Sequence, residues 1–324
     1  MSGESYFVVG GAGFIGSHFV DRLLSDSGSG RVTIYDNFSS GREWHYAKHL
    51  NDARFAVVRG DVKDLETLTQ AMAGHETVIH LASNPDIAKA MTQPDVDFYE
   101  GTLLTNQVVE AIRLSGAKAI LYASGSGVYG DLGETEARED HAVGKPVSTY
   151  GASKLAGETL ISAYCSMFGL RGRAFRFGNV VGPHQTHGVG FDFVRNLLND
   201  PTRLDILGDG RQSKSYIHVE DVIEAVLTSH RAPGPAYDVF NVATGDYITV
   251  TEIAELAIEC LGMPRGSVPF RYAGGDRGWK GDVPVVRLST AKIRALGWRC
   301  RRSSREALRA AMLAMIEEFR SGRI

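Results

Sequence analysis

The chain has few cysteines and lacks long hydrophobic runs. Its 324 residues include three cysteines, Cys165, Cys260 and Cys300, which lie far apart and without C-x-x-C spacing. This number and spacing favour neither a disulfide framework nor a zinc site. No apolar stretch approaches the length of a membrane span, and no basic and apolar leader precedes the first predicted strand. We therefore expect a cytoplasmic protein with reduced thiols and no membrane partner.

A strong excess of either charge is also absent. The formal net charge of −3 gives no reason to expect a nucleic-acid partner. The arginine-rich stretch 299–305 precedes a predicted helix at 306–319 and is typical of a solvated face. His184 and His187 have no third ligand at metal spacing, so we predict no metal site.

A glycine motif is the first positive signal along the chain. Gly10, Gly13 and Gly16 follow an apolar run at 6–9 and precede an amphipathic pattern at 14–24. A glycine turn between a strand and a helix aims backbone N–H groups at a pyrophosphate. A second predicted strand at 31–35 is followed by Asp36, whose carboxylate can accept from ribose hydroxyls and repel a 2′-phosphate. The motif therefore predicts NAD rather than NADP.

Strand and helix patterns alternate over the first half of the chain. Further strands are predicted at 54–58, 77–81, 119–123 and 173–177, with helical patterns between them. This alternation predicts an α/β fold with a doubly wound parallel sheet of the Rossmann type. Beyond residue 178, glycine and proline become more frequent, which indicates a smaller mixed α/β lobe. We predict an NAD-binding domain over 1–178, rejoined by about 217–245, and a substrate-binding lobe over 179–216 and 246–324.

Tyr150 and Lys154 stand four residues apart on a predicted helix. A phenol ionises near pH 10 in water, so a tyrosine base at neutral pH needs a nearby cation. Lys154, one helical turn further on, can supply that charge. The two residues therefore indicate proton transfer beside the dinucleotide. Met167 and Phe168 continue the same helix, and we expect them to be packing residues.

These motifs, in this order, resemble those of the extended short-chain dehydrogenase/reductases of the NAD-dependent nucleotide-sugar epimerase/dehydratase family. The similarity is greatest to UDP-glucose and UDP-glucuronate 4-epimerases, and it extends from the glycine motif through V128-Y-G130 to S215-Y-I-H-V219. It implies a tightly held NAD, a small-molecule UDP-sugar substrate and catalysis by Tyr150 and Lys154. It also implies a homodimer that forms through the helix at 98–114 and the helix of Tyr150.

The resemblance assigns the remaining binding residues to two groups. The NAD group, which includes Tyr150 and Lys154 beside the nicotinamide, consists of Gly10, Gly13, Phe14, Ile15, Gly16, Asp36, Asn37, Ser39, Ser40, Gly41, Asp61, Val62, Leu81, Ala82, Ser83 and Phe177. The substrate group, which includes Tyr150, consists of Ser124, Gly125, Ser126, Asn179, Val189, Leu204, Ile206, Lys214, Arg277 and Asp282. Lys214 stands where relatives usually carry arginine, and the spacing from Arg277 to Asp282 is longer than in the common epimerases.

The segment before V128-Y-G130 departs from the family pattern. Gly125 occupies the position at which relatives place a catalytic serine or threonine. Ser124, Ser126, a water molecule, or Tyr150 acting alone are the alternatives for that role. Relatives that eliminate water carry an Asp-Glu pair just before this V-Y-G, and decarboxylating relatives carry a Glu, because these reactions need a further acid or base. This chain has Ser126 and Gly127 there, which disfavours both reactions.

We therefore predict an isomerase, an NAD-dependent UDP-sugar 4-epimerase. Small residues and hydroxyl groups at 124–127 favour UDP-glucuronate, converted to UDP-galacturonate, as the substrate. The alternatives are a UDP-glucose/UDP-galactose 4-epimerase, a UDP-sugar decarboxylase or dehydratase, and a non-catalytic NAD-sensing protein of the same fold.

Overall fold

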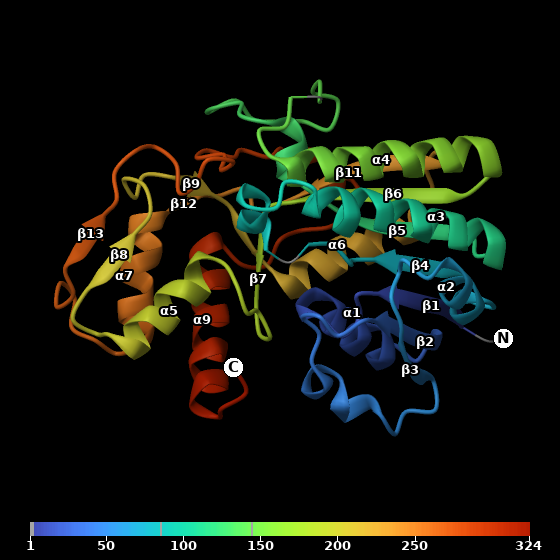
Figure 1. Cartoon of the computed structure of the whole chain (residues 1–324), viewed down its shortest axis with the longest axis horizontal. Coiled ribbons are helices and arrows are strands. Elements are labelled where there is room, and N and C mark those ends of the chain that lie inside the picture. Colours follow the sequence, from blue (N-terminus) through green and yellow to red (C-terminus); the bar gives the residue numbers. More distant parts are fainter. Residues whose placement is uncertain (1–2, 85, 144) are drawn as a thin grey trace. The chain divides into compact units, whose positions relative to one another are not determined.

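The computed structural model describes residues 3–84, 86–143 and 145–324 (Figure 1). The chain forms two compact units, each described below by itself. Unit 1 comprises Met1–Val128, Thr149–Arg176 and Val226–Phe240, and unit 2 comprises Tyr129–Ser148, Phe177–Ala225 and Asn241–Ile324.

The bounds of these units differ from the predicted domains at residues 129–148. This segment groups with unit 2, where the Ala137 carbonyl accepts a hydrogen bond from the Asn241 side chain at 2.9 Å and the Tyr129 hydroxyl donates to the same side chain at 2.8 Å. The segment predicted to rejoin the NAD-binding domain, about 217–245, also differs, because its residues up to Ala225 group with unit 2. In that unit the Trp298 indole donates to the Asp221 carbonyl at 3.0 Å.

A seven-stranded sheet confirms the predicted α/β class. The strand order is β11-β6-β5-β4-β1-β2-β3, and the pairs β1/β2, β2/β3, β1/β4 and β4/β5 are parallel. From β1 the chain adds β2 and β3 on one side and then β4, β5 and β6 on the other, so the strand order reverses between β1 and β4. In doubly wound sheets the ligand crevice opens at this point. The strands are β1 (Glu4–Val9), β2 (Ser29–Asp36), β3 (Phe55–Arg59), β4 (Thr77–His80), β5 (Ala119–Gly125), β6 (Arg171–Phe177) and β11 (Tyr237–Val242).

Helices cover the sheet because its strands are apolar on both faces. On one face, Phe7 and Val9 of β1 pack in a buried cluster with residues of α2, α3 and α4. The intervening Val8 is fully buried as well, as expected for a strand covered on both sides. The helices are α1 (Phe14–Ser25), α2 (Leu65–Met72), α3 (Leu103–Ser115), α4 (Thr149–Phe168) and α6 (Val219–Arg231), with short 3₁₀ turns at Glu43–His45, Ala47–His49, Ile87–Met91 and Ser126–Tyr129.

A single helix was predicted over residues 98–114, but its first turn is a π-helix. This element, η4 (Phe98–Thr102), leads directly into α3. Gly101 lies within it, and a Cβ there would stand 2.1 Å from the Ser153 Oγ of α4. The wider turn therefore accompanies a close approach of α4, and π-turns of this kind are frequent at functional sites.

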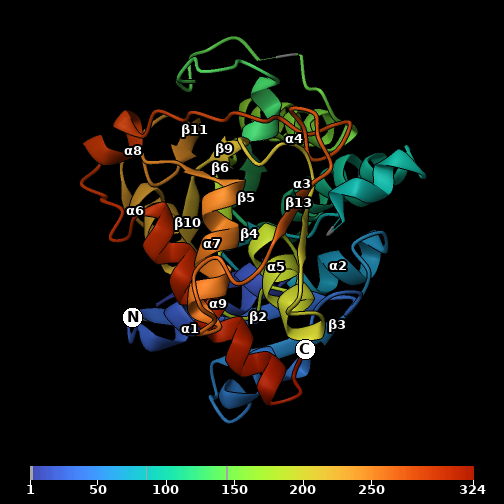
Figure 2. The ribbon, with the colours of Figure 1, turned by 90° about the vertical axis from the view of Figure 1, so that its left-hand side faces the viewer.

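Unit 2 has a core of its own formed by α5, α7 and α9. Phe191, Leu256 and Met312 are among the buried residues of this cluster. Three two-stranded sheets accompany the helices: β7 pairs with β10, β9 with β12, and β8 with β13. The elements are β7 (Asn179–Val181), α5 (Val189–Asn199), β8 (Leu204–Ile206), β9 (Ser213–Lys214), β10 (Tyr216–His218), β12 (Ile248–Thr249), α7 (Val250–Cys260), β13 (Phe270–Tyr272), α8 (Ala291–Ala295) and α9 (Ser304–Arg320) (Figure 2).

Within the described residues, no helix combines the length and apolar character needed to cross a membrane. Cys165, Cys260 and Cys300 are free thiols.

Candidate active site

The glycine motif forms a tight turn between β1 and α1. Gly10 adopts φ +81°, and a Cβ at this residue would come 2.9 Å from the backbone nitrogen of Ala82. At Gly16, a Cβ would meet the carbonyl oxygen of Gly10 at 2.3 Å. Only glycine fits these two positions. Helix α1 begins after Gly13 without a side-chain cap, so its N-terminal N–H groups are available to a pyrophosphate.

Asp36 is buried at the carboxyl end of β2 and faces the glycine turn. One of its carboxylate oxygens accepts from the backbone nitrogen of Ala12 at 2.9 Å, and the other accepts from that of Phe38 at 2.8 Å. Burial raises the pKa of Asp36, and these two hydrogen bonds act in the opposite direction. The structure thus places an acceptor beside the turn, where it suits ribose hydroxyls and opposes a 2′-phosphate.

Further predicted NAD residues follow the ends of neighbouring strands. Asn37, Ser39, Ser40 and Gly41 follow β2, Asp61 and Val62 follow β3, and Leu81, Ala82 and Ser83 follow β4. Parallel strands present their carboxyl ends at one edge of a sheet, so these segments share the edge that carries the glycine turn. These groups fit a dinucleotide, because they combine an uncapped helix end, which offers N–H donors, with a carboxylate acceptor and short polar loops. Phe177 is the last residue of β6 and is buried.

Tyr150 and Lys154 occupy the first turns of α4. The Lys154 ammonium lies 5.4 Å from the centroid of the Tyr150 ring, and it donates to the Ala123 carbonyl at 2.9 Å. Burial lowers the pKa of Lys154 to about 8, and attraction to Asp97 opposes that shift. Burial raises the pKa of Tyr150 to about 12, while a hydrogen bond with the Ser83 side chain lowers it. The pair therefore consists of a neutral phenol beside a cation whose charge is retained at neutral pH.

Ser124 and Ser126 have different surroundings. The buried Ser124 hydroxyl donates to Glu158 Oε1 at 2.6 Å. Glu158 is itself held by Arg176, which donates to Oε1 at 3.0 Å and to Oε2 at 2.7 Å. Ser126 is half-buried at the start of the turn Ser126–Tyr129. At Gly125, a Cβ would meet nothing within 4 Å, so open space adjoins this residue.

The predicted substrate residues Lys214, Arg277 and Asp282 come together in unit 2. Lys214 Nζ lies 2.5 Å from Asp282 Oδ1, and Arg277 donates to the Asp282 carbonyl at 2.7 Å. Arg277 also donates to Asp131 Oδ2 at 2.6 Å. Two cations thus converge on one segment, and each is paired with a carboxylate, Lys214 with Asp282 and Arg277 with Asp131.

The other predicted substrate residues of unit 2 lie on short strands and a helix end. Asn179 is exposed on β7, and its side chain donates to the Ser215 carbonyl at 3.3 Å. Leu204 and Ile206 lie on β8 with buried side chains. Their backbone takes part in the pairing with β13, since the Leu204 N–H donates to the Pro269 carbonyl at 3.1 Å and the Ile206 carbonyl accepts from the Ala273 N–H at 2.9 Å. Val189 is the first residue of α5.

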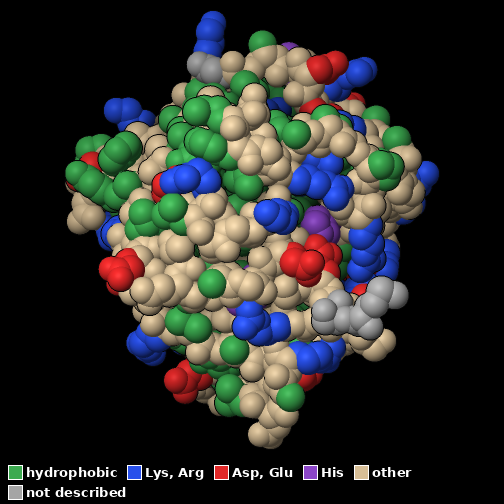
Figure 3. Space-filling view, turned by 90° about the vertical axis from the view of Figure 1, so that its right-hand side faces the viewer, with side chains coloured by type: hydrophobic (Ala, Val, Ile, Leu, Met, Phe, Trp, Pro, Cys, Tyr) green, Lys and Arg blue, Asp and Glu red, His purple; other side chains and the backbone are tan. Residues whose placement is uncertain are grey.

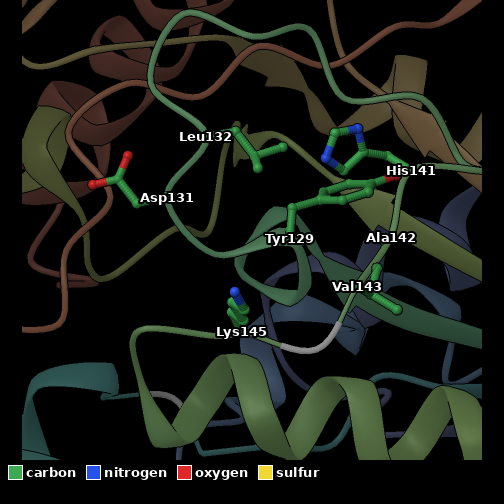
Figure 4. A pocket seen from close by; sticks show the side chains of 7 residues that line it. All are labelled: Tyr129, Asp131, Leu132, His141, Ala142, Val143 and Lys145. Atoms are coloured by element: carbon green, nitrogen blue, oxygen red, sulfur yellow. The ribbon is translucent and has the colours of Figure 1, made fainter.

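A cavity of about 270 Å³ lies in unit 2 (Figure 4). Its lining residues are Tyr129, Asp131, Leu132, His141, Ala142, Val143 and Lys145. It contains none of the residues that the sequence assigns to cofactor or substrate, so we do not identify it with the catalytic site. Among the described residues, no cluster of His, Cys, Asp or Glu side chains could hold a metal ion.

The sequence reasoning missed Glu158 and Asp97. Glu158 lies four residues after Lys154, and this spacing on one helix was the available signal. Asp97 is 1% exposed and accepts from the Thr149 hydroxyl at 2.6 Å. No sequence pattern pointed to it, because the two partners lie 52 positions apart.

The sheet, the glycine turn and the Tyr-Lys pair define a dinucleotide-dependent enzyme of the extended short-chain dehydrogenase/reductase class. A family model, the NAD dependent epimerase/dehydratase family, matches residues 6–243. The chain belongs to this family, and NAD is its cofactor.

The alignments with individual relatives cover nearly the whole chain. The UDP-glucose 4-epimerase of Mycolicibacterium smegmatis is 33% identical over 326 residues, which cover 97% of this chain and 98% of that protein. The crystal structure of a double mutant of DesIV, a dTDP-glucose 4,6-dehydratase from Streptomyces venezuelae with NAD bound, aligns with a TM-score of 0.89 and 26% identity over 98% of each chain. MoeE5 in complex with UDP-glucuronic acid and NAD aligns with a TM-score of 0.83 and 28% identity, covering 98% of this chain and 99% of that one.

Proposed function

We propose that this enzyme is a UDP-sugar 4-epimerase with UDP-glucuronate as its preferred substrate. The observation that carries the proposal is the pairing of Tyr150 and Lys154 beside a segment, residues 124–127, that has no carboxylate. One proton-transfer pair suffices for oxidation and reduction at a single carbon. Elimination or decarboxylation needs a further acid or base in that segment.

Tyr150 is the group that takes the proton of the sugar O4 and later returns it. The Lys154 ammonium favours the phenolate through its charge, and the Ser83 side chain stabilises the same oxygen by a hydrogen bond. A bound NAD would be held at the glycine turn and beside Asp36, and it would supply reversible hydride transfer at C4, with the hydride returned to the opposite face of the sugar. Because the cofactor is regenerated, the reaction changes configuration without net oxidation.

Glu158 is the carboxylate that touches this segment, and its contacts oppose a role in elimination. Both of its oxygens accept from Arg176, and one also accepts from Ser124. A carboxylate that is buried in a charge-assisted pair of this kind is poorly suited to exchange protons with a substrate. This arrangement favours the epimerase over a lyase of the same family.

The space beside Gly125 and the hydroxyl of Ser126 favour a uronate. The C6 carboxylate of a uronate needs more room than the hydroxymethyl group of glucose, and open space adjoins Gly125. The carboxylate also needs hydrogen-bond donors, and the Ser126 hydroxyl is one. UDP-glucose is the alternative substrate at the same site, and single side chains decide such preferences. Asn179, Lys214, Arg277 and Asp282 are the proposed contacts for the UDP moiety. The free thiols support a reducing, cytoplasmic location.

A homodimer through α3 and α4 is part of the proposal. Hydrophobic side chains gather in the upper left part of the face shown in Figure 3. The exposed apolar residues of η4, α3 and α4 are Phe98, Tyr99, Leu114, Met167 and Phe168. Replacing Phe168 by Asp should convert a dimer to a monomer in light-scattering chromatography, whereas Leu313→Asp, on the exposed part of α9, should not.

Proton NMR and mass spectrometry of the sugar nucleotide test the activity. The purified protein is incubated separately with UDP-glucuronate and UDP-glucose, without added NAD. Conversion of the uronate to its C4 epimer at unchanged mass is the expected result. Loss of 44 mass units, the mass of CO₂, would identify a decarboxylase, and conversion of UDP-glucose alone would identify the galactose-type epimerase. Tyr150→Phe should lower the rate by about three orders of magnitude or more while NAD remains bound.

A further inference from the structure

Asp97 is a buried carboxylate that joins two segments of unit 1. Its Oδ2 accepts from the Thr149 hydroxyl at 2.6 Å, and its Oδ1 accepts from the Asn84 side-chain amide at 2.9 Å. Asn84 is fixed in turn, because its amide also donates to the Asp86 carbonyl at 2.8 Å. Charge-assisted bonds of this kind are strong and directional.

The two segments carry groups that meet at the phenol of Tyr150. Thr149 is the first residue of α4 and directly precedes Tyr150. Asn84 directly follows Ser83, whose side chain forms a hydrogen bond with Tyr150. Asp97 itself precedes the π-helix η4, which packs closely on Ser153 of α4. One carboxylate thus connects the segment of the base to the segment of its hydrogen-bond partner.

Asp97 also provides negative charge near Lys154. Lys154 is 4% exposed, and Asp97 is the charged group whose attraction opposes the loss of its proton. The rings of Tyr150 and Tyr122 face the ammonium at 5.4 and 5.2 Å, and neither carries a charge near neutral pH. Burial lowers the pKa of His80 to about 3, so this neighbour is neutral too. Asp97 therefore supplies a negative charge that offsets the cost of burying this ammonium.

We propose that Asp97 is a positioning residue of the proton-transfer pair, which fixes Tyr150 through Thr149 and supplies the counter-charge of Lys154. The inference deepens the proposed function and rests on it. It adds Asp97 to Tyr150, Lys154 and Ser83, and it separates two contributions, geometry through the Thr149 hydroxyl and charge through the carboxylate.

Two substitutions separate these contributions. Asp97→Asn keeps the shape and removes the charge. Loss of a negative charge lowers the pKa of both Tyr150 and Lys154, so both limbs of the kcat–pH profile should move to lower pH, by roughly one unit. Thr149→Val removes the hydroxyl and keeps the charge. It should lower kcat by about tenfold at unchanged KM and leave both limbs in place. Asp95→Asn, an exposed carboxylate two residues away, is the matched control.

A readout that does not depend on turnover completes the test. The pH dependence of Lys154 acylation by acetic anhydride, followed by mass spectrometry, reports the ionisation of the amine in each variant. We expect its midpoint to fall in Asp97→Asn and to stay constant in Thr149→Val and Asp95→Asn. If Asp97→Asn does not fold, an unchanged kcat in Thr149→Val overturns the proposal. Equal labelling midpoints in wild type and folded Asp97→Asn also overturn it. An inactive wild type would refute the proposed epimerase alone, because the labelling result would still report on Asp97.

Discussion

The ammonium of Lys154 lies 5.4 Å from the ring centroid of Tyr150 and is anchored to the Ala123 carbonyl at 2.9 Å. Burial lowers the pKa of Lys154 to about 8, so the cation is present below that pH and disappears above it. The free enzyme should therefore lose kcat/KM as pH rises above about 8.

Lys154→Arg tests this assignment of the alkaline limb. A guanidinium remains charged throughout the accessible range, although its shape differs from that of an ammonium. We expect a lower kcat/KM, by about tenfold or more, that no longer declines between about pH 8 and 10. An alkaline limb that persists in this variant would assign it to another group.

Ser124 and Ser126 should respond differently to replacement by alanine. Ser124→Ala removes a donor to the buried Glu158 and should lower the free energy of unfolding by about 1–3 kcal/mol, measured in urea. Ser126→Ala should leave stability within about 0.5 kcal/mol of wild type. If Ser126 serves the uronate, the same variant should reduce turnover of UDP-glucuronate more than that of UDP-glucose. Equal losses on both substrates would count against the uronate.

The parallel strands could be predicted from the sequence because each buried strand is a short local run of mostly apolar residues. The apolar run 6–9 lies within β1 (Glu4–Val9), and the predicted strand 31–35 lies within β2 (Ser29–Asp36). Strands covered on both faces are nearly continuous apolar runs, and their short length, β-branched residues and flanking glycines identify them as strands. The NAD cofactor could be predicted because the glycine motif and Asp36 lie close together in sequence. The family could be predicted because its motifs follow one another in order along the chain.

Features that depend on distant contacts could not be predicted. Met167 and Phe168 were expected to be packing residues, and they are 71% and 44% exposed. An apolar pair at the end of a helix gives the same pattern whether its partner is the chain's own core or a second copy. The π-turn at η4 likewise depends on Ser153, and the burial of Asp97 depends on Thr149. Both contacts join residues about 50 positions apart, so no local pattern in the sequence indicates them.

Asp36 should control the choice between NAD and NADP. Its carboxylate accepts from two backbone nitrogens, so an asparagine would leave one of them facing an amide donor. Asp36→Asn should therefore weaken NAD binding by about tenfold. Without the charge, the 2′-phosphate of NADP is repelled less, so the dissociation constant of NADP divided by that of NAD should fall by a similar factor. Fluorescence titration measures both constants. An unchanged ratio would show that another residue excludes the 2′-phosphate.

Glu4 should make the stability of the protein depend on pH in the acid range. Its carboxylate accepts from Tyr6 and Thr77 at 2.6 Å and lies 2.7 Å from His230 Nε2. Burial acts to raise the pKa of Glu4, but the hydrogen bonds with His230, Thr77 and Tyr6 outweigh it and lower the pKa to about 2.

A depressed pKa means that the ionised carboxylate stabilises the folded state. This contribution is fully present above the usual glutamate pKa of 4.5 and is lost as pH falls from there towards 2. Because the Glu4 side chain is 36% exposed, solvent screening limits the effect to about 1 kcal/mol. In urea unfolding, Glu4→Gln should therefore be less stable than wild type by about that amount at pH 7, and the difference should shrink below about pH 4.5. Glu43→Gln, an exposed carboxylate, is the control. A difference that stayed constant down to pH 3 would show that shape, not charge, accounts for the effect.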